Sequence, residues 1–257
     1  MRGFLLGLLM ALGFLVPGAA AVAQSSGYVL GPDDAIQVIV YGQPEVSITT
    51  RIKSDGTIVM PLIGSVRAEG QTNVALAKTV GDKLVQGGFL KDPVVNIEIQ
   101  AYVSKFVNVA GQVTQPQIVP LDRPYRALEV LLKAGWVRET GANYVYLRRP
   151  GSPEQRLAIE DLVRGTPDKD PLLQPGDTLF VPNADTFFIT GAINRPGSFQ
   201  VLPGMTVRQA LAVSGGVSPT GSSNKVGLIR DGGKERDADM TQTLQKNDVI
   251  IVKERLF

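Results

Sequence analysis

A pattern of short apolar runs separated by glycines occurs twice in the second half of the chain. At an offset of 80 residues, the matched positions are residues 109–113 with 189–193, Pro116 with Pro196, Gly135 with Gly215, and Thr140-Gly141 with Thr220-Gly221. With a shorter offset, residues 173–179 match residues 244–250. Because the spacing changes only in a middle stretch, the match predicts two copies of one folding unit.

Each copy has the pattern of one helix and several short strands. The expected strands are residues 106–109, 144–147 and 178–181 in the first copy and residues 187–190, 225–229 and 249–252 in the second. The first helix is expected from about Tyr125 to Ala134, with Gly135 as its stop. In the second copy, Thr206 and Gln209 form a capping box, and Gly215 ends the helix. One helix packed on one mixed sheet is a β-grasp-like arrangement.

The segment before the repeats forms a different unit. Apolar and polar residues alternate from 95 to 101, which predicts a strand with one buried face. Asp55-Gly56 is predicted to be the tight turn of a hairpin that joins residues 46–53 to residues 57–63. Thr72 is expected to cap a helix whose apolar stripe is Leu76, Ala77, Val80 and Leu84.

The N-terminus has the pattern of a secretory signal peptide. Arg2 is followed by an apolar run at residues 4–16, by Pro17-Gly18 and by an Ala-x-Ala site that ends at Ala23. Cleavage at this site leaves Gln24 as the first mature residue. The alternative is an uncleaved anchor, because a spanning helix needs about 20 residues and the uncharged stretch is that long. Pro17-Gly18 interrupts such a helix, which favours cleavage and export.

The composition excludes several kinds of site. The sequence contains neither cysteine nor histidine, so disulfides, Ser-His-Asp and Cys-His nucleophiles and ordinary zinc sites are ruled out. Without cysteine, no residue can carry an N-terminal lipid. The chain has 26 basic and 24 acidic residues, and removal of Arg2 with the signal leaves 25 against 24, a net charge of +1. This balance argues against a nucleic-acid partner, because such surfaces are usually strongly basic.

The remaining candidates for chemistry are carboxylates, and each has a simpler interpretation. Glu160-Asp161 and the pair Glu235 and Asp237 lie in polar stretches between strands, where solvated charge is expected. Asp33, Asp34 and Asp55 lack the spacing of a calcium-binding loop and suit turns. We therefore expect no catalytic residue, no metal site and no cofactor.

The N-terminal unit and the two repeats together resemble the outer-membrane polysaccharide export family over the whole mature chain. Residues 28–101 are similar to its polysaccharide export domain, and the two repeats look like its SLBB domains, which are β-grasp modules. The motif positions in the first unit are Gly31, Pro32, Asp34, Asp55, Gly56, Pro61, Gly64, Gly70, Thr72, Asp92 and Pro93. Those in the repeats are Gly111, Pro116, Gly135, Gly191, Pro196, Gly197, Gly215 and Gly216. We interpret all of them as structural positions.

Two positions depart from the family pattern. Asp33 stands where the family has a glycine, and Trp136 replaces the second glycine of the first helix stop. Trp136 is also the sole tryptophan of the chain. We favour a packing role between the first repeat and a neighbour, with a contact between subunits or a platform for a sugar as alternatives. Arg148-Arg149 and the pair Arg123 and Arg126 could line a path for an acidic polymer, but we interpret them as exposed loop charge.

The resemblance implies a ring of subunits in the periplasm, associated with the outer membrane, around a path along which a capsule or exopolysaccharide leaves the cell. It also implies an inner-membrane polysaccharide co-polymerase, the chain-length regulator, as a partner. Pore-forming members carry an amphipathic helix after the last SLBB domain, whereas only residues 253–257 follow the closing strand here. A strand that crosses hydrocarbon needs roughly 9 residues or more. We therefore expect a short form that relies on a separate outer-membrane component.

The sequence thus predicts an α+β protein: a signal peptide at residues 1–23, a polysaccharide export domain at 24–103, and β-grasp-like SLBB domains at 104–184 and 185–257. We expect a non-enzymatic component of a polysaccharide export machine that forms a homo-oligomeric ring. One alternative is a periplasmic SLBB-type module that binds a soluble ligand, peptidoglycan or DNA and transports nothing. Another is a polysaccharide-modifying enzyme that uses a carboxylate pair.

Overall fold

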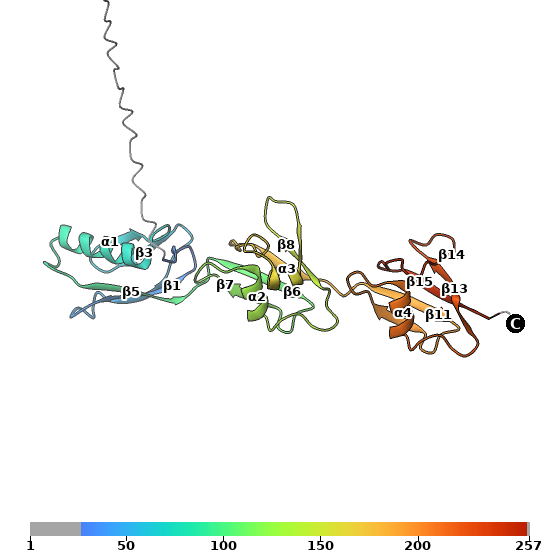
Figure 1. The fold of residues 1–257 in the computed structure, drawn as a ribbon. Helices are drawn as coiled ribbons and strands as arrows, with labels where there is room; N and C mark the ends of the chain where they lie inside the picture. The colour runs from blue at the N-terminus through green and yellow to red at the C-terminus, as the bar shows by residue number, and fades with distance from the viewer. Residues whose placement is uncertain (1–26, 256–257) are drawn as a thin grey trace, which may run out of the picture.

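The computed structural model describes residues 27–255. The predicted signal peptide, with its cleavage between Ala23 and Gln24, lies outside the described residues. Three small domains follow one another in a row, with the N-terminal domain at one end and the second repeat domain at the other (Figure 1). Each domain has its own hydrophobic core. Within the described residues, no helix is both long and apolar enough to cross a membrane.

The N-terminal domain combines a three-stranded antiparallel sheet, a separate hairpin and one helix. The sheet has the order β2-β1-β5, and β3 pairs with β4 in the hairpin. The elements are β1 (Ala35–Val40), β2 (Ile48–Arg51), β3 (Thr57–Met60), β4 (Gly64–Arg67), α1 (Asn73–Gln86) and β5 (Val95–Ala101). Thr72 caps α1 as predicted, and its side chain accepts a hydrogen bond from the Ala75 N–H. The buried residues of α1 are Leu76, Val80 and Leu84.

The Asp55-Gly56 turn is present, but the hairpin predicted around it is wrong. β2 pairs with β1 and β3 pairs with β4, so the turn joins two different sheets. Just before the turn, Ile52 is buried and exchanges backbone hydrogen bonds with Asp33 and Asp34, which ties the chain down before it reaches β3. A turn sequence shows where the chain reverses, whereas pairing depends on which apolar faces meet in the core.

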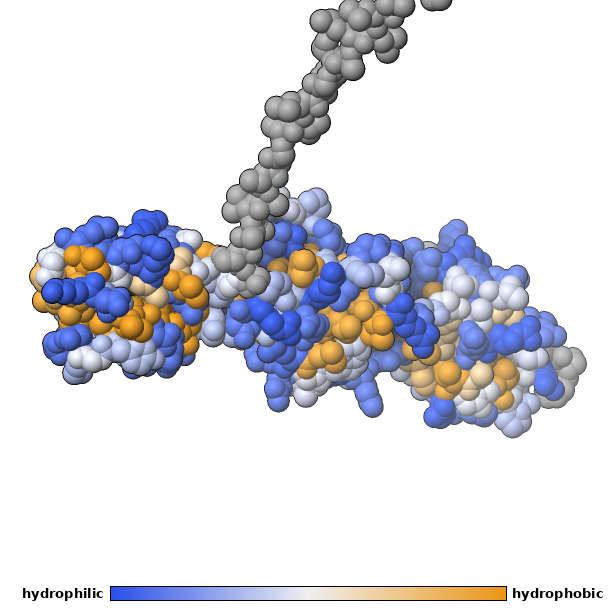
Figure 2. Space-filling view, turned by 60° about the vertical axis from the view of Figure 1, so that its left-hand side comes forward, coloured by the Kyte–Doolittle hydropathy of each residue, from blue (hydrophilic) through white to orange (hydrophobic). Residues whose placement is uncertain are grey.

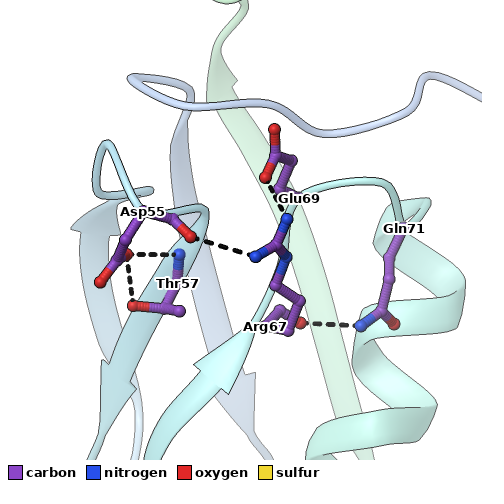
Figure 3. Close-up of polar contacts among 5 residues, drawn as sticks. All are labelled: Asp55, Thr57, Arg67, Glu69 and Gln71. Atoms are coloured by element: carbon purple, nitrogen blue, oxygen red, sulfur yellow. Dashed lines mark hydrogen bonds and ion pairs between the residues drawn. The ribbon is translucent and has the colours of Figure 1, made fainter.

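Side chains fix this turn from both sides (Figure 3). The Asp55 carboxylate accepts hydrogen bonds from the backbone N–H and the hydroxyl of Thr57, at 2.9 and 2.7 Å. Arg67 donates to the Asp55 carbonyl and pairs with Glu69, and Gln71 donates to the Arg67 carbonyl. The bonds from Thr57 favour the ionised carboxylate, so the pKa of Asp55 lies below its usual range.

The two repeat domains share one topology, which confirms the internal duplication and the α+β fold. Their five-stranded mixed sheets have the orders β7-β6-β10-β8-β9 and β12-β11-β15-β13-β14, and β6 with β10 and β11 with β15 are the parallel pairs. The first domain contains β6 (Phe106–Gly111), β7 (Gln117–Pro120), α2 (Ala127–Lys133), β8 (Tyr144–Arg148), β9 (Gln155–Ala158), α3 (Ile159–Arg164) and β10 (Thr178–Val181). The second contains β11 (Thr186–Gly191), β12 (Gly197–Gln200), α4 (Val207–Val213), β13 (Gly221–Ile229), β14 (Arg236–Asp237) and β15 (Val249–Glu254).

The helix ends follow the signals in the sequence. The capping box between Thr206 and Gln209 is formed at the start of α4, and Gly215 after its end has a left-handed φ of +81°. Helix α2 begins at Ala127, two residues later than expected. The reason is that Arg126 is extended and forms a β-bridge with Leu172, which holds the preceding chain out of the helix.

One aspartate turn occurs in all three domains. In each, a fully buried carboxylate accepts a hydrogen bond from the backbone N–H three residues earlier, and the residue before the aspartate has a positive φ. The bonds join Gly31 to Asp34 at 2.9 Å, Gln174 to Asp177 at 2.8 Å and Gln245 to Asp248 at 2.8 Å. The positive φ angles are +70° at Asp33, +86° at Gly176 and +64° at Asn247. Asp33 therefore adopts the left-handed conformation that a glycine adopts more easily.

An arginine neutralises the buried aspartate in both repeat domains. Arg149 donates through Nε and Nη2 to Asp177, at 2.9 and 2.8 Å. Arg230 binds Asp248 in the same way, at 2.9 and 2.7 Å. The interpretation of Arg149 as exposed loop charge is therefore wrong, since its side chain is only 24% exposed. These bonds raise the pKa of both arginines.

Candidate functional site

A buried carboxylate ties the N-terminal domain to the segment that leads into the first repeat domain. Asp34 accepts hydrogen bonds from the backbone N–H groups of Val103 and Ser104, at 2.8 and 2.7 Å, and from the Ser104 hydroxyl at 2.9 Å. The Tyr28 hydroxyl donates to the same carboxylate at 2.9 Å, and burial raises the pKa of this phenol. Lys105 lies 5.2 Å from the centre of the Tyr28 ring, and burial lowers the pKa of its amine. These contacts fix the chain at the point where it passes between the domains.

A second set of contacts joins the two repeat domains. The Asp185 carboxylate lies 3.5 Å from the Tyr144 hydroxyl of the first domain and 3.6 Å from the Lys246 ammonium of the second. Gln200 of β12 donates to the Glu139 carbonyl across the same junction. Polar contacts around Asp185 therefore hold the two repeat domains together.

A pocket of about 700 Å³ lies at this second junction. Its walls come from residues 136–144 and 156–164 of the first repeat domain, and Pro203 of the second domain contributes to its rim. The volume falls within the roughly 300–1,000 Å³ of small-molecule sites. Because the pocket lies on the first repeat domain beside this junction and is open to solvent, it is the candidate functional site of the described part of the chain.

The pocket combines aromatic rings with positive charge. The Arg156 guanidinium stacks on the Tyr144 ring, 3.8 Å from its centre. Burial raises the pKa of Tyr144 to about 12, and the nearby Asp185 carboxylate adds to the effect. Arg138 donates to a backbone carbonyl of the same domain, that of Thr114. In residues 27–255, neither Arg138 nor Arg156 forms an ion pair with a carboxylate.

Among residues 27–255, the only carboxylate that lines the pocket is already paired. Glu160 lies in the first turn of α3 and forms an ion pair with Arg164, 3.3 Å away on the same helix. The pocket therefore holds three arginines and one glutamate. Its net charge is positive, which suits an anionic ligand.

Trp136 lines this pocket and packs against the core of the first repeat domain. Its φ is +73°, a left-handed conformation that is uncommon for a bulky side chain. Its backbone carbonyl accepts a hydrogen bond from the Thr114 N–H at 2.9 Å, which holds the main chain in this position. The favoured packing role, the subunit contact and the sugar platform all remain predictions.

The other motif residues do not gather at the pocket. Gly111 and Gly191 lie where β6 and β11 run beside β10 and β15, and a Cβ atom there would meet a carbonyl oxygen at 2.0 and 2.2 Å. The remaining motif glycines and prolines are distributed over turns, loops and strand starts of all three domains. Glu235 and Asp237, the other acidic pair from the sequence, both face Lys253, at 2.9 and 3.8 Å. No cluster of three acidic side chains that could hold a metal is found within the described range.

The sequence interpretation missed Tyr144, Arg138 and Arg156 as members of a site. Tyr144 lies on β8, Arg156 lies on β9 and Arg138 lies in the loop after α2, so only the strand pairing brings them together. Tyr146 of β8 lies opposite Arg156 of β9 in the antiparallel register, which places Arg156 beside the Tyr144 ring. The difference between the two repeats at these positions is the sequence signal that could have revealed these residues.

Comparison with known proteins identifies the domains. Residues 22–100 match the family model described as polysaccharide biosynthesis/export protein, and residues 106–158 and 186–239 match that of the SLBB domain. The chain carries the domains of the polysaccharide export family. The N-terminal domain is thus the export domain, and the repeat domains are SLBB1 and SLBB2. The family assignment made from the sequence is confirmed.

Curated relatives of the chain are export and transport proteins. The EPS I polysaccharide export outer membrane protein EpsA of Ralstonia nicotianae is 27% identical over 234 residues, covering 78% of this chain and 60% of that protein. The protein of the same name from Ralstonia solanacearum is 26% identical with the same coverage. The polysialic acid transport protein KpsD of Escherichia coli is 24% identical, over 91% of this chain and 43% of its own length. The chain therefore spans 60% or less of these relatives.

Proposed function

We propose that this chain is a component of a capsule or exopolysaccharide export machine and that its copies form a ring around the path of the polymer. The observation that carries the proposal is the order of its domains, an export domain followed by two SLBB domains. The names of the curated relatives support the same role. We place the assembly in the periplasm, in association with the outer membrane, and assign it no enzymatic step.

The shape of the molecule suits a ring. Three domains in a row, held at both junctions, form an elongated body (Figure 1). Ring closure by a heterologous interface needs two different sides, one for each neighbour, and an elongated body offers two long sides for this.

The export domain also exposes apolar side chains that an interface would cover. Val74 and Val85 on α1 are 73% and 46% exposed, and Val94 beside β5 is 60% exposed. Figure 2 shows apolar surface on this domain between hydrophilic regions. Exposed apolar patches commonly mark contacts between proteins. We assign this side to the neighbouring subunit.

The proposed partners are other copies of the chain, the exported polysaccharide, an inner-membrane polysaccharide co-polymerase and a separate outer-membrane component. A nucleic acid is not among them, because the net charge is close to zero. Cross-linking in cells, followed by identification of the captured proteins, tests the two protein partners.

Two measurements test the proposal. Deletion of the gene is expected to abolish the surface or secreted glycan, and a plasmid copy is expected to restore it. Native mass of the mature protein is expected to show a closed oligomer that dissociates when Val74 and Val85 are changed to Glu. A protein that stays monomeric at every concentration, in a cell that exports glycan normally without it, would instead fit the alternative of a ligand-binding SLBB module.

A further inference from the structure

The tryptophan in the pocket occupies a position that the fold fills better with glycine. Trp136 follows the left-handed Gly135 at the end of α2, and its own φ is +73°. At the same position of SLBB2, Gly216 follows Gly215 and has a φ of +80°. Glycine adopts this conformation freely, whereas a bulky side chain is strained in it. Since SLBB2 has the same fold with glycine at this position, the fold does not require the strained tryptophan. The strained Trp136 therefore points to a role beyond folding.

The neighbours of Trp136 differ between the two domains in the same way. Leu147 and Leu228 are equivalent buried positions, and each lies two residues before the arginine that binds the turn aspartate. Counting from these leucines, Tyr144 corresponds to Lys225. The strand registers pair Tyr146 with Arg156 in SLBB1 and Gly227 with Asp237 in SLBB2.

SLBB2 thus has glycine, lysine and aspartate where SLBB1 has tryptophan, tyrosine and arginine. The residues that maintain the fold are kept in both domains: Gly111 and Gly191, Asp177 and Asp248, and Arg149 and Arg230. Because SLBB2 folds without the aromatic and basic set, that set is not required by the fold. It forms a feature of SLBB1 alone.

The set has the chemistry of a site for an acidic sugar. The half-buried Trp136 lines the pocket, and an aromatic ring suits the apolar C–H face of a pyranose ring. The Arg156 guanidinium is held in place by the Tyr144 ring and has no carboxylate partner among residues 27–255. Arginine binds carboxylates through two parallel hydrogen bonds, which gives both affinity and orientation. Arg138, on the same wall as Trp136, adds a second positive charge.

We propose that the pocket between SLBB1 and Pro203 binds an anionic sugar unit, with the ring on Trp136 and the carboxylate on Arg156 and Arg138. Tyr144 acts as a positioning residue for Arg156. This inference rests on the proposed export function in one respect: it takes the exported polymer as the source of the sugar. It predicts that the export machine transports a glycan that contains uronic acids or similar acidic units.

The sole tryptophan of the chain lies in the pocket, so its fluorescence reports binding there without any label. The probe is trigalacturonate, and the matched neutral probe is maltotriose, which has the same type of linkage and no carboxylates. Trigalacturonate is expected to change the emission of Trp136 in a saturable way. Maltotriose at the same concentrations is expected to cause no saturable change.

Two variants and one control identify the residues responsible. Arg156→Gln is expected to weaken trigalacturonate binding by about tenfold or more, the loss typical of a hydrogen bond to a charged group. Trp136→Gly, measured by calorimetry, is expected to abolish binding while the domain stays folded, since Gly216 occupies the equivalent position. The control is Arg236→Gln, which makes the same change on the exposed β14 of SLBB2 and is expected to bind as the wild type does. The site is overturned if both trisaccharides bind equally, if neither binds, or if either pocket variant binds like the wild type.

The outcomes separate this site from the export function. Loss of glycan export on gene deletion, together with no selective binding of trigalacturonate, rejects the site and leaves the export function standing. Selective binding with export unchanged by deletion rejects the export function and leaves the site.

Discussion

The carboxylate of Asp34 accepts hydrogen bonds from both the backbone N–H and the hydroxyl of Ser104, at 2.7 and 2.9 Å. The two residues are 70 positions apart in the sequence, and Ser104 lies in the segment that connects the export domain to SLBB1. Asp34 also ends the export domain's aspartate turn through its bond from Gly31. One buried side chain therefore fixes a turn inside a domain and the exit of the chain from that domain.

Asp34→Ala is expected to lower the free energy of unfolding of the export domain by about 3 kcal/mol or more, because several buried N–H groups lose their acceptor. The junction should loosen as well, so small-angle scattering should show a larger radius of gyration. Asp55→Ala is the control, since Asp55 is exposed and serves only its own turn, and it should cost less than about 1 kcal/mol. Equal losses in the two variants, with the same scattering curve, would contradict the role of Asp34 at the junction.

The sequence was sufficient for features that depend on local chemistry. Thr72, the capping box of Thr206 and Gln209, and the stops at Gly135 and Gly215 were all found where hydrogen-bonding side chains or a left-handed φ are needed at a helix end. The duplication was found in the same way, because each copy repeats these local requirements. The polysaccharide export family followed from the motifs.

Features that depend on pairing between distant strands could not be predicted. The Asp55-Gly56 turn was found, but β3 pairs with β4 because its apolar side chains are buried there, which no turn sequence specifies. The pocket needs the register of β8 and β9 to bring Arg156 to Tyr144. The Arg149–Asp177 pair spans 28 residues, and its repetition as Arg230–Asp248 becomes meaningful only once the strands are aligned.

Arg149→Gln is expected to destabilise SLBB1 by about 3–5 kcal/mol, because it leaves the fully buried Asp177 carboxylate without its counter-charge. Trp136 lies in SLBB1, so its fluorescence during urea unfolding follows that domain. Arg230→Gln should leave the tryptophan transition in place and shift the transition of SLBB2 seen by circular dichroism. Arg148→Gln, which breaks an exposed pair with Glu154, should cost less than about 1 kcal/mol. If Arg149→Gln lowers the free energy of unfolding of SLBB1 no more than Arg148→Gln does, the buried Arg149–Asp177 pair is unimportant for stability.

Gly111→Ala is expected to cost about 3 kcal/mol or more, because the added Cβ would meet the Val181 carbonyl oxygen at 2.0 Å and φ is +88°. Gly151→Ala is the matched control, since its φ is +73° and a Cβ there meets nothing within 4 Å. The control should cost only about 1–2 kcal/mol, the penalty of the left-handed conformation. Tryptophan fluorescence in urea measures both values. Similar losses would mean that the close approach of β6 and β10 adds nothing to the conformational penalty.

The raised pKa of Tyr144 predicts how SLBB1 responds to alkaline pH. Its pKa is about 12 in the folded domain against an ordinary value of 10.0, because burial and the Asp185 carboxylate both disfavour the phenolate. Folding therefore favours the protonated phenol. The resulting stabilisation is fully present below pH 10 and is lost as the pH rises from 10 to about 12.

Urea unfolding followed by Trp136 fluorescence across this window should show the free energy of unfolding of SLBB1 falling with pH. In Tyr144→Phe the fall should be shallower, since the group that titrates is gone. Tyr28 also has a raised pKa, but it lies in the export domain and does not contribute to the tryptophan signal. An equal slope in the two proteins would show that Tyr144 is not protected from ionisation, and that the ring beneath Arg156 is more open to water than its contacts with Arg156 and Asp185 indicate.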